Sequence, residues 1–155
     1  MSTLETCLGD IHATILQQHA EIRARFRGLD AGATPASSAL AAVYLRVSLL
    51  RLAVLLELHL QYEERELGPR LRVLDAWGAA REAALHAEHA GQRKRLAHLC
   101  FLAESETVAD LDLASEVSRL VVSLLEEMAR EERELDELDE LDRLESGGPF
   151  AQMTG

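Results

Sequence analysis

Histidines and glutamates interrupt three rows of apolar residues at positions where a helix would turn them inward. Steps of three and four residues keep one face of an α-helix. The interrupting residues are His12 and His19 in the first row, His59 and Glu63 in the second, and Glu127 and Glu131 in the third. A carboxylate inside an apolar core is costly unless a cation, a proton or a metal ion compensates it. Imidazoles and carboxylates that meet from several helices therefore indicate a metal site.

An internal repeat adds a third histidine to this set. HAEIRARF at His19 resembles HAGQRKRL 70 residues later, and HLQYEEREL at His59 resembles EMAREEREL 68 residues later. Two such similar offsets suggest a duplicated helical hairpin. The repeat pairs His19 with His89, His59 with Glu127, and Glu63 with Glu131. Three histidines and three carboxylates are enough donors for two metal ions.

Four helices must position these residues. The Ser2-Thr3-Leu4-Glu5 capping box opens a helix that runs to about Arg27, and the Gly68-Pro69 dipeptide ends the second. We expect helices over about 2–27, 37–67, 75–103 and 112–145, the second capped by the serines at 37 and 38. These helices predict an all-α fold, an antiparallel up-down four-helix bundle over residues 1–145. A flexible tail is expected over 146–155.

Composition excludes several classes of partner. The chain has 155 residues and a net charge of −11, with 27 acidic residues against 16 scattered basic ones, so we expect no binding to nucleic acid. The apolar segment Leu45–Leu60 contains two arginines and a glutamate and is too short to span a membrane. Cys7 and Cys100 have no CxxC spacing, which favours a reducing, cytoplasmic location.

The sequence resembles the hemerythrin-like (HHE) domain family from about Leu4 to Leu144. The family pattern is a histidine, an HxxxE pair, a histidine and a second HxxxE pair on successive helices. The matching residues are His19 in QQHAEIRARF, His59 and Glu63 in ELHLQYEEREL, and His89 in HAEHAGQRKRL. The resemblance implies a four-helix bundle that holds a non-haem di-iron centre with bridging carboxylates. It also implies reactivity toward dioxygen, peroxide or nitric oxide.

The fourth helix departs from the family pattern because it lacks the expected histidine. The aligned pair is Glu127 and Glu131, and a shift by one residue would instead give Met128 and Glu132. The first register is preferred because it keeps both the repeat and the leucine row. A carboxylate in place of an imidazole makes the site harder, which favours ferric iron and admits manganese more readily. Oxidation, peroxide chemistry or redox sensing is therefore favoured over reversible oxygen carriage.

The complete expectation is a centre of two iron ions, with manganese and zinc as alternatives. The predicted ligands are His19, His59, Glu63, His89, Glu127 and Glu131. Glu63 and Glu131, the repeat-related pair, are the candidates for bridging, and a role for His86 or His12 stays open. Whether the protein is an enzyme also stays open. The alternative function is a metal-free scaffold that binds a partner through its acidic fourth helix, since that helix has lost its histidine.

Overall fold

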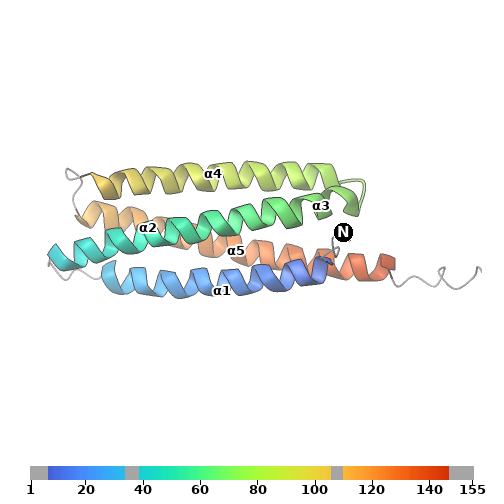
Figure 1. The fold of residues 1–155 in the computed structure, drawn as a ribbon, viewed down its shortest axis with the longest axis horizontal. Coiled ribbons are helices and arrows are strands. Elements are labelled where there is room, and N and C mark those ends of the chain that lie inside the picture. Colours follow the sequence, from blue (N-terminus) through green and yellow to red (C-terminus); the bar gives the residue numbers. More distant parts are fainter. Residues whose placement is uncertain (1–6, 34–38, 106–109, 147–155) are drawn as a thin grey trace, which may run out of the picture.

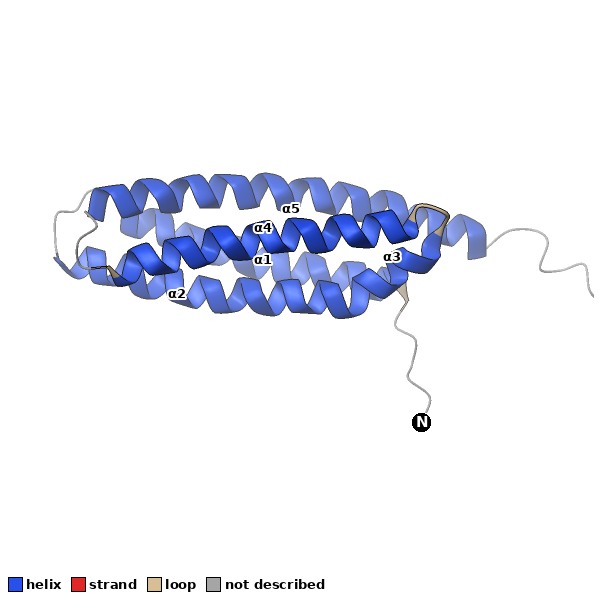
Figure 2. Ribbon diagram, turned by 90° about the horizontal axis from the view of Figure 1, so that it is seen from above, coloured by secondary structure: helices blue, strands red, loops and turns tan. Residues whose placement is uncertain are grey.

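The computed structural model describes residues 7–33, 39–105 and 110–146, and these ranges are helical apart from short turns and ends. The helices are α1 (Leu8–Ala33), α2 (Ala39–Tyr62), the π-helical turn η1 (Glu63–Leu67), α3 (Gly68–Leu74), α4 (Gly78–Glu104) and α5 (Asp110–Ser146). Because α2, η1 and α3 follow one another directly, the described chain forms four long rods that pack as a bundle (Figures 1 and 2). α1 lies against α2 and α5, and α4 lies against α2, α3 and α5. The predicted all-α class is confirmed.

Two predicted helix ends are wrong. The first helix does not stop near Arg27 but continues through Gly28 to Ala33. The Gly68-Pro69 dipeptide does not end the second rod, which continues as α3 to Leu74. The capping box at 2–5, the serine pair at 37–38 and all of the predicted tail after Ser146, which is the last residue of α5, lie outside the described residues.

The π-helical turn explains how the second rod passes its proline. Pro69 has no N–H, and in a regular α-helix its ring would clash with the carbonyl of Arg65. The N–H of Gly68 donates to the carbonyl of Glu63, five residues earlier, so the helix is locally widened before the proline. Such π-helical turns are frequent at functional sites, and this one begins at a predicted metal ligand.

A tight turn over 75–77 joins α3 to α4. The Asp75 carboxylate accepts hydrogen bonds from the Trp77 backbone N–H at 2.8 Å and from Arg81 at 2.6 Å. Gly78 begins α4 so close to α3 that a Cβ atom there would lie 2.2 Å from the carbonyl oxygen of Leu71. Only glycine fits this approach between the two backbones.

The apolar core is divided into two clusters by a polar layer. The larger cluster includes Ile22, Leu56 and Met128, and the smaller one includes Ile15 and Leu135. His19 lies between Ile15 and Ile22 on α1, and Glu131 lies between Met128 and Leu135 on α5. The predicted metal ligands therefore lie where the apolar core is interrupted. Among the helices that the structure describes, none is both long and apolar enough to cross a bilayer.

Candidate metal centre

Four side chains of the polar layer could hold one metal ion. His19, His59, Glu63 and Glu131 each offer a ligand atom, and these atoms lie within 4.8 Å of one another. They come from α1, α2, η1 and α5, so the centre forms only when these rods pack together. His19, His59 and Glu63 are buried, whereas the Glu131 side chain remains 23% exposed. Glu131 therefore marks the side on which the centre approaches solvent.

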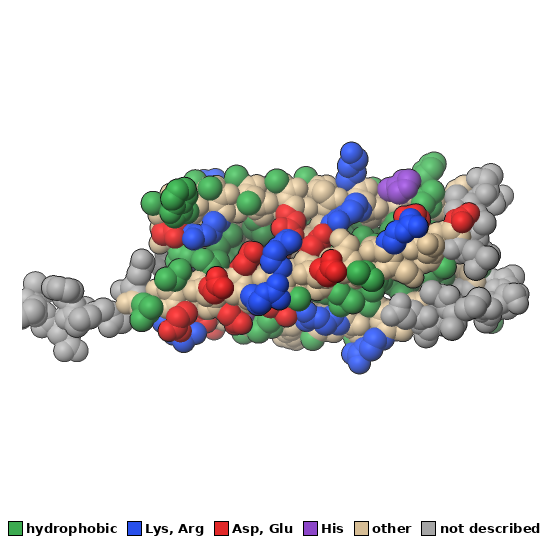
Figure 3. Space-filling view, turned by 180° about the vertical axis from the view of Figure 1, so that it is seen from behind, with side chains coloured by type: hydrophobic (Ala, Val, Ile, Leu, Met, Phe, Trp, Pro, Cys, Tyr) green, Lys and Arg blue, Asp and Glu red, His purple; other side chains and the backbone are tan. Residues whose placement is uncertain are grey.

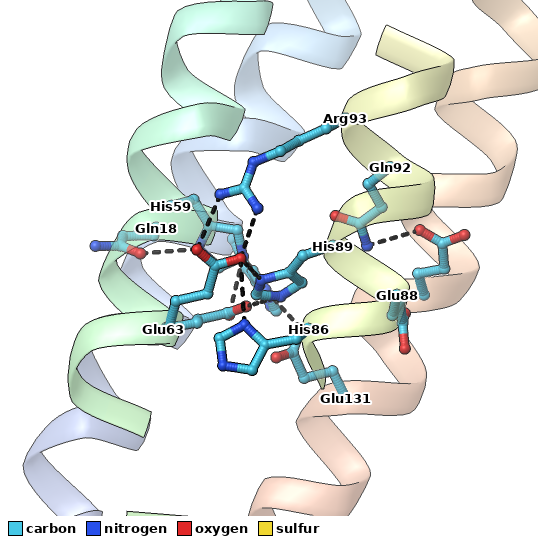
Figure 4. A network of polar contacts seen from close by, with 12 residues as sticks. Gln18, His59, Glu63, His86, Glu88, His89, Gln92, Arg93 and Glu131 are labelled. Atoms are coloured by element: carbon cyan, nitrogen blue, oxygen red, sulfur yellow. Dashed lines mark hydrogen bonds and ion pairs between the residues drawn. The ribbon is translucent and has the colours of Figure 1, made fainter. Parts of the chain in front are cut away.

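The Nε2 atoms of His59 and His89 face the Glu63 carboxylate (Figure 4). The Nε2 atoms of His19 and His59 are 3.2 Å apart, and His19 Nε2 lies 3.4 Å from Glu131 Oε2. Glu63 lies between two histidines, with Oε1 3.0 Å from His59 Nε2 and Oε2 3.0 Å from His89 Nε2. His89 on α4 thus faces the second oxygen of Glu63.

The outer nitrogen of each histidine has its own acceptor. His19 Nδ1 lies 2.8 Å from Glu132, and His59 Nδ1 lies 2.8 Å from Gln18. His89 Nδ1 lies 3.0 Å from Glu64. An Nδ1–H that donates outward leaves the Nε2 lone pair directed inward, which is the arrangement typical of histidine ligands. Two lone pairs that face each other across 3.2 Å repel unless a proton or a cation lies nearby. A proton on one Nε2 atom or a metal ion between the two would relieve this repulsion.

Arginines hold two of these outer acceptors in place. Arg23 donates to Glu132 at 2.7 Å, and Arg93 donates to Glu64 at 2.6 Å. The Arg93 guanidinium lowers the pKa of Glu64, and Arg23 with His19 outweighs burial and lowers the pKa of Glu132. Both acceptors are therefore ionised at neutral pH and fix the orientation of His89 and His19.

The inner carboxylates differ in pKa. Burial opposes the ionisation of Glu63, but its contacts with His59 and His89 outweigh burial and lower its pKa to about 2. Burial raises the pKa of Glu131 to about 7, and the charge of Glu63 adds to the effect although His19 opposes it. Two adjacent carboxylates commonly behave in this way, since one ionises at the expense of the other.

Two of the histidines bind protons more readily than usual. Burial disfavours the charged form, but the carboxylates at 131, 132 and 63 outweigh burial and raise the pKa of His19. Glu63 and Glu64 likewise outweigh burial and raise the pKa of His89. A metal ion that binds to Nε2 must displace these protons.

One buried atom tests whether these residues fit a metal ion. Glu63 Oε1 is buried and accepts no hydrogen bond from any residue that the structure describes, although His59 Nε2 is close to it. A buried carboxylate oxygen without a hydrogen bond is costly. A metal ion would use this free lone pair together with the inward Nε2 atoms. The donor set of imidazoles and carboxylates fits iron, manganese or zinc.

Glu127, a further predicted ligand, lies outside this group. Its carboxylate accepts hydrogen bonds from Arg95 at 2.7 Å, Gln92 at 2.9 Å and Ser123 at 3.1 Å. The physical reason is that Arg95 on α4 offers a direct ionic partner. The next residue, Met128, is buried in the larger apolar cluster.

The two histidines whose role stayed open also lie apart from the centre. His12 is buried near two aspartates of α5, with its ring nitrogens 3.5 Å from Asp136 and 3.8 Å from Asp139. The His86 side chain is half exposed, and its Nδ1 lies 3.9 Å from Glu64. Neither belongs to the group of four that could hold a metal ion.

Sequence reasoning did not predict the acceptors Gln18 and Glu64, and it named Glu132 only as a ligand in the alternative register. Each is the chain neighbour of a predicted ligand: Gln18 precedes His19, Glu64 follows Glu63 and Glu132 follows Glu131. Adjacent helical residues point about 100° apart. A polar residue next to a ligand can thus reach the outer edge of a histidine on a neighbouring helix. Its position beside a predicted ligand was the sequence feature from which such an acceptor could have been predicted.

Comparisons with protein-family models, with curated proteins and with solved structures find no match to this chain. The hemerythrin-like resemblance therefore stays a prediction from the sequence pattern. What the structure adds is the position of each residue in that pattern.

Proposed function

We propose that this chain is a hemerythrin-like metal protein, an antiparallel four-helix bundle with a non-haem di-iron centre that binds or reacts with dioxygen, peroxide or nitric oxide. One observation carries the proposal. The inward Nε2 atoms of His59 and His89 each lie 3.0 Å from a different oxygen of Glu63. A carboxylate between two imidazoles suits a pair of metal ions that share it.

The two metal positions are unequal in their donors. The first is surrounded by His19, His59, Glu63 and Glu131, whereas the second has His89 and the other oxygen of Glu63. We therefore expect one ion to bind more tightly than the other. Manganese or zinc would compete for the tighter position, because imidazole and carboxylate donors suit all three metals.

The surroundings suit chemistry on a small oxidant. Bound iron would supply one-electron redox chemistry that no side chain of this layer provides. The two apolar clusters flank the layer along the bundle. The partly exposed Glu131 leaves a side on which a small molecule can approach.

The metal content of purified protein tests the proposal. The protein is loaded with ferrous iron without oxygen, desalted and analysed for iron per chain, and its visible absorption is then followed as air or peroxide is added. We expect close to two irons per chain and an absorption change on oxidation. Glu63→Gln should lose both ions, because both positions use this side chain.

Two matched variants test the assignment on α5. Glu131→Gln should lower the iron content, whereas Glu127→Gln should retain it because Glu127 is bound to Arg95. A protein that takes up only zinc would have a structural centre without redox chemistry. A protein that takes up no metal would instead support the scaffold function through the acidic fourth helix.

A further inference from the structure

A cavity of about 260 Å³ adjoins the metal centre between the α3 end of the second rod, α4 and α5. Its apolar wall is made by Leu67, Leu71, Leu85, Leu135, Leu138 and Leu141. His89 and Glu131 also line it, so the cavity reaches both predicted metal positions. The rest of the lining is polar and charged, and it consists of Gln92, two arginines (Arg81 and Arg130) and three further glutamates (Glu88, Glu134 and Glu137).

This volume exceeds what a diatomic oxidant or peroxide requires. An engineered apolar cavity of about 150 Å³ in another protein is large enough to bind benzene. A cavity of about 260 Å³ is therefore suited to a molecule with two fused aromatic rings or a comparable alkyl chain.

The charges around the cavity favour a neutral occupant. The two arginines that line it are already paired, Arg81 with Asp75 and Arg130 with Glu88 and Glu134. An anion would therefore find no free cation there, and it would meet the carboxylate of Glu137, which also lines the cavity. A cation would find Glu88 and Glu134, which also line the cavity, already paired with Arg130. It would also have to lose water against the leucines of the wall, which is costly.

The cavity is open to solvent along α4 and α5. Ala84 on α4 and Leu141 on α5 both line it and are exposed. Figure 3 views the molecule from the α5 side, where acidic and basic side chains are interspersed with hydrophobic ones. A small molecule could thus pass between these helices without unfolding of the bundle.

We propose that this cavity binds a neutral, mostly apolar organic molecule of about the size of a two-ring aromatic alcohol, with its polar group toward His89 and Glu131. Such a molecule would be held next to the metal centre, as a co-substrate or a ligand of the reaction there. Only that consequence rests on the proposed function, because binding in the cavity does not require a metal ion.

Binding of 1-naphthol tests the proposal, because this probe is neutral, fluorescent and of the expected size. The probe is titrated into metal-free and metal-loaded protein while its fluorescence is recorded. Ala84→Trp should fill the mouth of the cavity and weaken binding by about tenfold or more. Ala83→Trp is the matched control, since Ala83 is also exposed on α4 but does not line the cavity, and it should leave binding unchanged.

Charged analogues complete the test. 1-Naphthoate and 1-naphthylmethylammonium have the same ring system with a negative and a positive charge, and both should bind at least about tenfold more weakly than 1-naphthol. The proposal is overturned if 1-naphthol does not bind saturably, if Ala84→Trp does not weaken its binding, or if either charged analogue binds as tightly.

The outcome is separable from that of the metal proposal. If the chain takes up no iron but binds 1-naphthol in the cavity, the function as a metal protein fails and the binding site stands. If the chain takes up iron but does not bind 1-naphthol, the proposed binding site fails and the function as a metal protein stands.

Discussion

The acceptors behind the histidines are expected to set the strength of metal binding. Gln18 accepts from His59 at 2.8 Å and has no charge, so this contact orients the imidazole without adding a charge to the centre. Loss of such an outer partner generally lowers metal affinity about 10- to 100-fold. The ligands themselves would remain in place.

Gln18→Ala should therefore weaken metal binding by about 10- to 100-fold while leaving the number of bound ions unchanged. Competition with a chelator of known affinity measures the effect. Gln17→Ala is the matched control, because Gln17 is exposed on the same helix, and its affinity should equal that of the unchanged protein. Equal affinities for the two variants would show that the Gln18 contact has no role in binding.

Protonation of the same layer should make the stability of the metal-free protein depend on pH. The pKa values of His19 and His89 are raised, so their contribution to the free energy of unfolding is complete below about pH 6.5 and is lost as the pH rises through the folded values. Glu131 acts in the same direction, because its pKa rises from 4.5 to about 7 on folding. Glu63, with a pKa of about 2, has the opposite effect only below about pH 4.5.

We expect the urea midpoint of chelator-treated protein to decrease as the pH is raised from 5 to 8. Glu131→Gln removes one of the titrating groups and should flatten the curve, whereas Glu134→Gln alters an exposed carboxylate and should not. Metal affinity should increase as the pH is raised over the same range, because protons compete with the ion for the same atoms. A midpoint that rises over this range would contradict the assignment of raised pKa values.

The turn between α3 and α4 depends on a single glycine. Gly78→Ala would place a Cβ atom 2.2 Å from the Leu71 carbonyl oxygen and 2.4 Å from that of Arg72, so one backbone must move. We expect this overpacking to lower the free energy of unfolding by about 1–3 kcal/mol. Urea denaturation followed by circular dichroism measures the change.

Gly91→Ala is the matched control within α4. A Cβ atom at Gly91 would have no neighbour within 4 Å, and the residue lies in the interior of the helix. Alanine should therefore raise the free energy of unfolding by about 0.5–1 kcal/mol through helix propensity. If both variants were stabilised, the close approach at Gly78 would be refuted.

The division of the core decides how the whole molecule responds to loss of metal. Each apolar cluster draws on more than two rods of the bundle and contains none of the predicted metal ligands. The bundle should therefore stay helical without metal. The ion would act as an additional ligand of the folded state.

Excess metal at about 100 times its Kd should stabilise the protein by about 2.7 kcal/mol, which corresponds to a rise in Tm of roughly 5–10 °C. Thermal unfolding of loaded and chelator-treated samples measures this difference, with far-UV circular dichroism to confirm the helical content. The Tm of Glu63→Gln should not rise when metal is added. Loss of helix on chelation would mean that the clusters alone cannot hold the rods together.

The amino-acid sequence by itself determined the helices and the faces that carry polar residues. His19 and His59 could be assigned to inner faces because helical periodicity is a local property of the chain, and the internal repeat added His89. The helix ends at Gly28 and Gly68 were not determined in this way, because glycine and proline only weaken a helix that packing can extend. The π-helical turn before Pro69 is such an extension.

Only the tertiary structure decided which glutamate of the fourth rod faces the centre. Glu127, Glu131 and Glu132 are of one residue type, and each has a different partner across the bundle: Arg95, His19 Nε2 and His19 Nδ1. The partner of each carboxylate comes from a part of the chain that is far away in sequence. The spacing of residues along one helix therefore does not predict it. The cavity beside His89 was undecided for the same reason, since its wall comes from several rods.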